Sequence, residues 1–581
     1  MKRLLLLIPL FLSTFAAAEE KLHPLLDEIW AFQMQQNPMW ATRMGMREAD
    51  SKMPDLSAAS LEAAATKNTE FMTRLEAIDA ASLSRTDAIT LQVQKLQLQN
   101  NVDSYRYNSH FVPFTSESGF YSSLGFLPSS HKFASLDDFQ NYLMRLAQFP
   151  EYFDQQISWM EKGLASGMTQ PKEVLEPLPS LVAGFIFDDP KASSFYRPFN
   201  IDKPDYLSSQ QWQTLQSQAA DTIANAVIAS YVKLKAFFVE QYIPKAKTTL
   251  GADSWPNGKA YYQNRAAYYT TTDMTVDEIH ELGLSEVKRI RGEMKQVMQE
   301  LEYKGTHAEF IHFLRTDPQF YAKTEQEIMR YAAYLSKKID GKLPKLFSYL
   351  PRTPYGVEPV PASIAPNYTT GRYISPNNDT EPGYYWVNTY ALDKRPLYAL
   401  PALTLHEAVP GHHLQIALSR ELEDLPNVRR FTYISAFGEG WGLYSEYLGK
   451  EVDFYETPYD EFGRLSYEMW RATRLVVDTG IHIKGWSRKQ AVDYMLENTA
   501  LSEHNVRTEV DRYITWPAQA LSYKIGELTI KRLRKKAEDA LGDKFDLRAF
   551  HKAVLEHGSV PLQVLENNIN IFIKNAAITN G

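Results

Sequence analysis

The segment Leu405–Gln415 reads LHEAVPGHHLQ and holds three histidines and one glutamate within eight positions. Imidazole nitrogens and carboxylate oxygens are the usual ligands of a catalytic zinc ion. In a metallopeptidase, the glutamate directly after the first histidine is the general base. The segment therefore predicts a zinc hydrolase in which His406 binds the metal and Glu407 is the base.

The spacing of these histidines differs from the common His-Glu-x-x-His motif, whose two histidines lie four residues apart on one helical face. On a straight helix His412 would lie about 9 Å and His413 about 10.5 Å along the axis from His406, too far to share one zinc ion with it. Pro410, however, has no N–H to donate to the carbonyl of His406, and Gly411 permits the backbone angles of a break. We therefore expect a break at this pair that brings His412 or His413 back towards His406. The alternative is a kinked helix whose histidines are only hydrogen-bonded groups.

The third metal ligand is expected in the segment Phe437–Glu446, which reads FGEGWGLYSE. A catalytic zinc site holds three protein ligands and leaves one position for water. Glu439 is the best candidate, because the glycines on both sides of it allow another backbone to come close. Glu446 lies on the same helical face, where it could orient a ligand or, like His413, bind the metal itself. An ordinary amphipathic helix with exposed acidic side chains is the alternative.

Polar residues further along the chain are candidates for catalysis and for contacts with a substrate. Tyr523, and after it Tyr513, could donate to the oxyanion of a tetrahedral intermediate, and either could equally be a packed core tyrosine. Four residues share one helical face and are expected to form an ion-pair network, unless an arginine receives a peptide carboxylate: Arg471, Arg474, Asp478 and His482. The candidates for substrate binding are Arg474, Arg512, Tyr513 and Asn388.

The first 18 residues have the pattern of a secretory signal peptide. Lys2 and Arg3 precede an apolar run to about Phe15, and three alanines before Glu19 fit the rule for cleavage. The apolar run is too short to be interpreted as a membrane span. We therefore expect a mature chain without a membrane anchor, located in the periplasm or outside the cell.

The 581 residues include no cysteine, which excludes disulfides, thiolate metal ligands and a lipid-modified N-terminal cysteine. Any metal must therefore be bound by His, Asp and Glu. The formal net charge of −8 argues against nucleic acid as a partner. Aromatic residues make up 13% of the chain, which is ample for a large core and an aromatic-lined cleft.

Apolar residues recur at helical spacing over much of the chain, for example around 136–163 and over 210–242. Thr275, with a glutamate three positions later, has the form of a capping box and starts a helix to about Leu301 whose charges are expected to face solvent. Residues 109–133 mix aromatic residues with turn formers. They predict an ordered loop that either closes the core or lines a substrate site.

A small β-hairpin is predicted just ahead of the histidine segment. Residues 351–383 are rich in proline, and the short runs 368–374 and 384–390 are β-prone and separated by the turn-forming residues 377–379. The exposed edge of such a hairpin could bind an extended peptide by β-augmentation, or the hairpin could have only a structural role.

These patterns together predict a mainly α protein with a small sheet. We expect residues 19–581 to form a single large helical domain, with an N-terminal helical half to about residue 250 and a metal-site half from about residue 251.

Six separated motifs carry a family resemblance: HEAVPGHHLQ from His406, GEGWGLYSEYL from Gly438, RLVVDTGIHIKGWS from Arg474, DRYITWPAQALSYKIGEL from Asp511, YYTTTDMTVDEIHELG from Tyr268 and GYYWVNTY from Gly383. They resemble the bacterial domain-of-unknown-function family 885, generally regarded as zinc metallopeptidases, and the resemblance covers most of the mature chain. The resemblance implies a large multi-helix fold similar to gluzincin peptidases, with a deep cleft. It also implies that His406, His412 and Glu439 hold one zinc ion with Glu407 as the base, and it favours His412 over His413.

The sequence thus predicts an exported zinc-dependent hydrolase that cleaves the amide bonds of peptides with metal-activated water. The alternatives are a catalytically inactive periplasmic binding or scaffold protein and a zinc amidohydrolase that acts on a non-peptide amide. The choice among amino-, carboxy- and endopeptidase action, and the oligomeric state, stay open.

Overall fold

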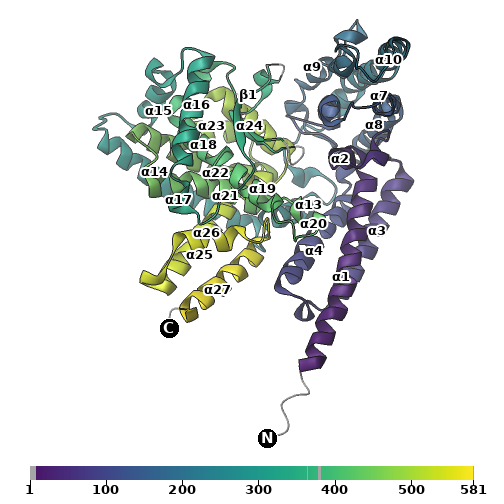
Figure 1. Ribbon diagram of the computed structural model, residues 1–581. Helices are drawn as coiled ribbons and strands as arrows, with labels where there is room; N and C mark the ends of the chain where they lie inside the picture. Colours follow the sequence, from purple (N-terminus) through teal and green to yellow (C-terminus); the bar gives the residue numbers. More distant parts are fainter. Residues whose placement is uncertain (1–7, 363, 377–380, 580–581) are drawn as a thin grey trace. The chain divides into compact units, whose positions relative to one another are not determined.

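The computed structural model describes residues 8–362, 364–376 and 381–579 (Figure 1). It is 71% helical, and within the described residues three short strands form one sheet, which confirms the predicted mainly α fold with a small sheet. Contacts along the chain group it into two compact units, residues 1–249 with 254–257 and residues 250–253 with 258–581. The first part of the predicted signal peptide, residues 1–7, lies outside the described residues.

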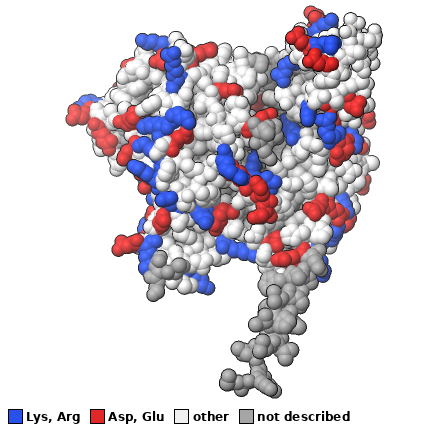
Figure 2. All heavy atoms as spheres, viewed as in Figure 1, with Lys and Arg blue, Asp and Glu red and all other residues white. Residues whose placement is uncertain are grey.

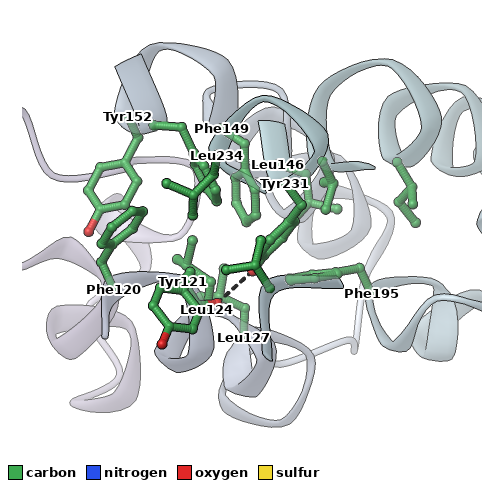
Figure 3. Close-up of a cluster of buried hydrophobic side chains, with 14 of the residues drawn as sticks. Phe120, Tyr121, Leu124, Leu127, Leu146, Phe149, Tyr152, Phe195, Tyr231 and Leu234 are labelled. Carbon is green, nitrogen blue, oxygen red and sulfur yellow. Dashed lines mark hydrogen bonds between the residues drawn. The ribbon is translucent and has the colours of Figure 1, made fainter. Parts of the chain in front are cut away.

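The first unit is built from helices around an aromatic core. Its longer helices are α1 (Ile8–Gln36), α2 (Pro38–Arg43), α3 (Ala58–Glu76), α4 (Arg85–Arg106), α7 (Leu136–Leu146), α8 (Phe149–Ser166), α9 (Leu178–Ala183), α10 (Ser209–Thr222) and α11 (Ala229–Phe237). Residues 109–133 form short helical turns, including α5 (Phe120–Ser123) and α6 (Leu127–Ser130). Figure 3 shows Phe120 and Tyr121 of this segment among the buried side chains, with the Tyr231 hydroxyl donating to the carbonyl of Tyr121 at 2.6 Å. The segment therefore closes the core of this unit.

The predicted long helix over 210–242 is present as the continuous helical segment Ser209–Lys245, in which π-helical turns join α10, α11 and α12 (Ile243–Lys245). Within the described residues this is the one segment long and apolar enough to cross a membrane. Many of its apolar side chains, among them Ile223, Tyr231 and Leu234, belong to the buried core of the first unit, whereas Val232 and Val239 are exposed. A core helix of a water-soluble unit has the same composition, so the segment needs no membrane to explain it.

The second unit contains all the candidate metal ligands. Its helices are α13 (Gly258–Thr270), α14 (Val276–Glu300), α15 (His307–Thr316), α16 (Glu325–Asp340), α17 (Leu343–Leu346), α18 (Leu400–Glu407), α19 (His412–Arg420), α20 (Asn427–Arg430), α21 (Ser435–Leu448), α22 (Pro458–His482), α23 (Arg488–Asn498), α24 (Glu503–Thr515), α25 (Ser522–Leu541), α26 (Leu547–Leu555) and α27 (Leu562–Thr579). Helix α22 is buried along almost its whole length. It packs against α14, and α21 packs against α25 (Figure 1).

Helix α14 starts with the predicted capping box: the Thr275 hydroxyl accepts from the backbone N–H of Glu278, and the Glu278 carboxylate accepts from that of Thr275. The expectation that its charges all face solvent is wrong for Glu286, which is buried and pairs with Arg289 at 2.7 Å and with the fully buried Lys524 at 3.0 Å. Lys524 comes from α25, so the periodicity of α14 alone could not indicate this ion pair. On the face shown in Figure 2, the charged side chains that do reach the surface are of both signs and interspersed.

The sheet has the strand order β1 (Tyr355–Pro359), β3 (Gly383–Val387), β2 (Gly371–Ile374). Strands β2 and β3 are antiparallel, with Tyr373 opposite Tyr385, as the predicted hairpin requires. The expected turn at 377–379 lies outside the described residues. Strand β1 pairs with β3 in parallel and was not predicted, because it lies in the proline-rich region. The deep cleft stays a prediction.

Candidate metal centre

The helix that carries His406 breaks where the sequence predicts. Helix α18 ends at Glu407 and α19 begins at His412. Gly411 is folded back so closely that a Cβ there would lie 1.9 Å from the carbonyl oxygen of His406. The indole N–H of Trp441, on α21, donates to the carbonyl of Pro410 at 2.8 Å and so stabilises the chain at the break. An unbroken helix with separated histidines is therefore ruled out.

The break brings His406, His412 and Glu439 together, with one ligand atom of each lying within 4.8 Å of the others. Glu439 Oε2 lies 3.3 Å from His412 Nε2 and 3.6 Å from His406 Nε2. In a tetrahedral zinc site with bonds of about 2.0–2.1 Å, neighbouring ligand atoms lie about 3.4 Å apart. The two carboxylate–imidazole separations and the donor set of two imidazoles and one carboxylate therefore fit a zinc ion.

Glu446 orients the first histidine. His406 Nδ1 and Glu446 Oε1 are 2.8 Å apart, and Arg471 approaches the same oxygen at 3.1 Å. If Nδ1 carries the proton in this hydrogen bond, the Nε2 lone pair points at the cluster, which is how carboxylates hold metal-binding histidines. Glu446 therefore lies behind His406 and outside the group of three ligand atoms.

The charges around the cluster favour a cation. Burial lowers the pKa of His406, but hydrogen bonds to Glu439 and Glu446 outweigh it and raise this pKa to about 9. Burial raises the pKa of Glu439, but the two histidines outweigh it and hold this pKa well below its usual value. Two imidazoles and the guanidinium of Arg471 face these two buried carboxylates, and a proton or a metal ion held between the imidazoles and Glu439 can supply the remaining positive charge.

The structure separates the two adjacent histidines. His413 Nδ1 lies 3.0 Å from the Tyr373 hydroxyl, and His413 Nε2 lies 3.0 Å from the carbonyl of Thr353. Burial lowers the pKa of His413 to about 4, so this ring is neutral. The residue spacing left both histidines open as ligands. The structure places His412 in the cluster, whereas His413 contacts Tyr373 of β2 and Thr353 just before β1.

Glu407 lies at the last position of α18, beside strand β2. Its Oε2 accepts a hydrogen bond from the backbone N–H of Tyr373 at 2.8 Å. Because this N–H donates to Glu407 and not to β3, it lies on the edge of β2 that faces away from β3. The β2 edge therefore holds the carboxylate that the sequence assigns as the base.

The two candidate tyrosines lie in different surroundings. The ring of Tyr523 stacks near that of His406, with centroids 6.3 Å apart, and its hydroxyl accepts from Arg512 Nη2 at 3.3 Å. Tyr513 is 1% exposed; its hydroxyl donates to Glu509 and accepts from Arg474 Nε and Trp470 Nε1, each within 2.9 Å. Tyr523 thus stands at the cluster, whereas Tyr513 is the packed core tyrosine of the alternative interpretation.

The other candidates for substrate binding are occupied by contacts within the chain. Arg474 pairs with Glu509 at 2.8 Å, and Arg512 also donates to Gln519 at 2.6 Å. Asn388 is fully buried, and its amide donates to the carbonyls of Ala365, Tyr368 and Thr369. Asn388 therefore anchors the loop before β2, and this position corrects the expectation that it contacts a substrate.

The four residues expected to form a network on α22 have separate partners: Arg471 pairs with Glu446, Arg474 pairs with Glu509, Asp478 accepts from the Tyr262 hydroxyl, and His482 Nε2 lies 2.9 Å from the carbonyl of Tyr513. Asp478 is fully buried, and its Oδ1 accepts from the Tyr262 hydroxyl at 2.6 Å and from the backbone N–H of Ala518 at 3.0 Å. Burial raises the pKa of this carboxyl to about 7. The folded state therefore keeps a proton that the unfolded chain loses above about pH 4.

We expect this proton to make stability depend on pH. Because the folded pKa is the raised one, the stabilisation is complete below about pH 4 and is lost as the pH rises through about 7. Asp478→Asn removes the titration, so the variant should gain stability relative to the natural chain, by a few kcal/mol, between pH 5 and 8. Urea unfolding of both proteins at several pH values measures this difference, and parallel pH profiles would contradict the prediction.

Three contacts at the cluster were not found from the sequence. The Tyr433 hydroxyl donates to Glu439 Oε1 at 2.9 Å, and the Tyr373 N–H holds Glu407. Gly442 lies so close to the metal-site ring that a Cβ there would be 2.7 Å from His406 Nε2. The sequence contained one signal, since glycines at 438, 440 and 442 weaken a helix and indicate close packing. The predicted close approach beside Glu439 is confirmed at Gly440, where a Cβ would lie 2.5 Å from the Cα of Gly526.

Comparison with known proteins gives a family but no activity. No curated protein matches the chain significantly. A solved structure from Colwellia psychrerythraea, described as a candidate lipoprotein, is 29% identical to this chain with a TM-score of 0.88. The match covers 96% of this chain and 99% of that one. Another from Shewanella oneidensis, described as a candidate lipoprotein of unknown function, is 18% identical with a TM-score of 0.66 and the same coverage, and so shows the fold alone.

The family match extends over nearly the whole chain. The family model described as "Bacterial protein of unknown function (DUF885)" matches residues 38–569, which include most of each unit and every residue of the cluster. The chain therefore belongs to the bacterial DUF885 family.

Proposed function

We propose that this protein is an exported zinc-dependent hydrolase that cleaves the amide bonds of peptides. The observation that carries the proposal is the convergence of His406 Nε2, His412 Nε2 and Glu439 Oε2 next to Glu407. Zinc bound by these three atoms would supply a Lewis acid that polarises a carbonyl group and makes water acidic enough to lose a proton near neutral pH. The remaining chemistry belongs to side chains of the chain itself.

Glu407 is proposed to act as the general base and then as the general acid of the hydrolysis. One oxygen of its carboxylate is held by the Tyr373 N–H, and this fixes the direction of the group. Glu407 takes a proton from the attacking water and passes it to the nitrogen of the leaving amine, so that the C–N bond breaks without forming an amide anion. General acid–base steps of this kind contribute about 100- to 10,000-fold to a rate.

Tyr523 is proposed to donate to the oxygen on which negative charge develops. Its hydroxyl accepts from Arg512, so this bond does not use the phenolic proton. The guanidinium of Arg474 lies 4.2 Å from the centre of the Tyr523 ring and adds positive charge behind it. A donor that is positioned before the reaction stabilises an oxyanion at little reorganisation cost.

The peptide part of the proposal is supported by the β2 edge. An extended chain can add to a free strand edge and be held through its backbone, with no reading of its side chains. At this edge the Tyr373 N–H donates to Glu407, so a peptide held by the remaining backbone groups of the edge would lie beside the base. Export is supported by the signal-peptide pattern and by the neighbours described as candidate lipoproteins, although this chain has no cysteine to carry a lipid.

Metal analysis and a peptide screen test the proposal together. The protein, purified without chelators, should contain close to one zinc ion per chain and should cleave members of a peptide library, detected by mass spectrometry. The cleavage positions would distinguish amino-, carboxy- and endopeptidase action. A zinc-free protein that gains no hydrolysis when zinc is added would indicate a binding protein, and a zinc-loaded protein that spares all peptides would indicate a different amide as substrate.

Gly442 offers a prediction about the site that alters no ligand. In Gly442→Ala the new methyl group would collide with the His406 ring, so zinc affinity should fall by about 10- to 100-fold. Gly292→Ala is the matched control, because this glycine also lies in a helix but a Cβ placed on it would have no atom within 4 Å. Competition with a chromophoric chelator measures both affinities, and equal values for the two variants would contradict the prediction.

A further inference from the structure

Tyr433 lies in the loop between α20 and α21, beside the carboxylate of Glu439. Its hydroxyl donates to Glu439 Oε1 at 2.9 Å. The other oxygen, Oε2, lies 3.3 Å from His412 Nε2 and 3.6 Å from His406 Nε2. The two oxygens of this carboxylate therefore have separate partners: Oε2 faces the histidines, and Oε1 faces the phenol.

The loop that carries Tyr433 is anchored on both sides of it. The buried guanidinium of Arg429 donates to the carbonyls of Ser559 at 2.8 Å and His557 at 2.6 Å. The backbone N–H of Ile434 donates to the Ser559 hydroxyl at 2.9 Å. The backbone at Tyr433 is thus tied to the segment that precedes α27.

The first turn of α21 leaves space for the phenol. A Cβ at Gly438 would lie 2.3 Å from Tyr433 Cε2 and 2.4 Å from its hydroxyl oxygen. Any other residue at this position would push the ring off the helix and away from Glu439. The glycine is therefore part of the same arrangement as the hydrogen bond.

We propose that Tyr433 is a positioning residue that restricts Glu439 to binding the metal through one oxygen. The proposal rests on the zinc site of the proposed function. A carboxylate that is free on both oxygens can bind zinc through either or both, and binding through both would take up the position that a catalytic site keeps for water. A phenol keeps its proton at neutral pH and so remains a donor to Oε1. Tyr433 thereby keeps three ligand atoms at the metal and one place open.

The test compares two tyrosines of the same site. Tyr433→Phe removes one oxygen atom from a side chain that is 39% exposed, so the fold should be retained. Its zinc affinity should fall by about 10- to 100-fold, the usual effect of losing a partner that orients a ligand. Tyr523→Phe is the control: its turnover should fall, and its zinc affinity should stay at the value of the natural chain.

Cobalt substitution gives a readout that does not depend on activity. Four-coordinate Co²⁺ absorbs visible light more strongly than five-coordinate Co²⁺, so the visible bands of Tyr433→Phe should weaken when Glu439 binds through both oxygens. Tyr523→Phe should keep the spectrum of the natural chain. Gly438→Ala displaces the ring instead of removing the hydroxyl and should reproduce both effects of Tyr433→Phe.

The outcomes separate the two proposals. Absence of zinc binding in the natural chain would overturn the proposed function and the role of Tyr433 with it. Normal zinc binding in the natural chain, with the same affinity and the same cobalt spectrum in Tyr433→Phe, would overturn the role of Tyr433 and leave the proposed function standing. Equal losses of affinity in Tyr433→Phe and Tyr523→Phe would also overturn it, because the effect would not be specific to the partner of Glu439.

Discussion

Glu407→Gln is expected to keep zinc bound and to lower turnover by about 100- to 10,000-fold. Glutamine has the shape of glutamate, and its carbonyl oxygen can still accept from the Tyr373 N–H, so the end of α18 should keep its structure. The amide, however, cannot take a proton from water at neutral pH. The variant thus removes the proposed base and changes little else.

Peptide hydrolysis and zinc content must be measured on the same preparation of this variant. Glu423→Gln is a matched control, because Glu423 is exposed and pairs only at the surface with Arg352. This control should have the zinc content and the turnover of the natural chain. Near-normal turnover in zinc-loaded Glu407→Gln would exclude Glu407 as the base, whereas loss of zinc from it would show that the variant disturbs the metal site itself.

The break between α18 and α19 could be predicted from two residue types. Pro410 lacks an N–H, Gly411 tolerates unusual backbone angles, and both effects act within the local chain. The structure accordingly ends α18 at Glu407 and starts α19 at His412. Which of two adjacent histidines faces the cluster is harder, because it depends on contacts of His413 with Thr353 and Tyr373, which come from the region of the sheet.

The sheet could be predicted only in part for a related reason. Strands β2 and β3 are short β-prone runs that follow each other, so the local pattern indicates a hairpin. Strand β1 includes Pro359 and lies among turn-forming prolines, and it is stabilised by pairing with a strand further along the chain. Local propensity cannot reveal a pairing of this kind.

The groups that support the site were not predictable, because each depends on packing between distant segments. The position of Tyr433 depends on Arg429 and Ile434 reaching Ser559. The burial of Glu286 depends on Lys524, which arrives on another helix. Glutamate is a residue type expected at a surface, and only the packed fold gives Glu286 a buried partner.

His412→Ala should lose zinc, whereas His413→Ala should keep zinc and lose stability, although the two residues are neighbours and both are buried. His412 supplies one of the three atoms of the cluster, so its removal should abolish stoichiometric zinc and, with it, peptide hydrolysis. His413 supplies none of them, so His413→Ala should keep zinc. It leaves the Tyr373 hydroxyl and the Thr353 carbonyl without this partner and should therefore destabilise the fold by about 1–3 kcal/mol.

Two measurements on both variants test this prediction: the zinc content after exhaustive dialysis and the midpoint of urea unfolding. Each variant controls for the other, since both remove a buried imidazole from the first turn of α19. Retention of zinc by His412→Ala together with its loss from His413→Ala would reverse the assignment and would mean that the chain around the sheet rearranges when metal binds. Loss of zinc from both would mean that the start of α19 must stay intact for the cluster to form. The expected result, loss of zinc from the first variant and of stability from the second, would tie metal binding to the backbone break at Pro410 and Gly411, because that break is what places His412 beside His406.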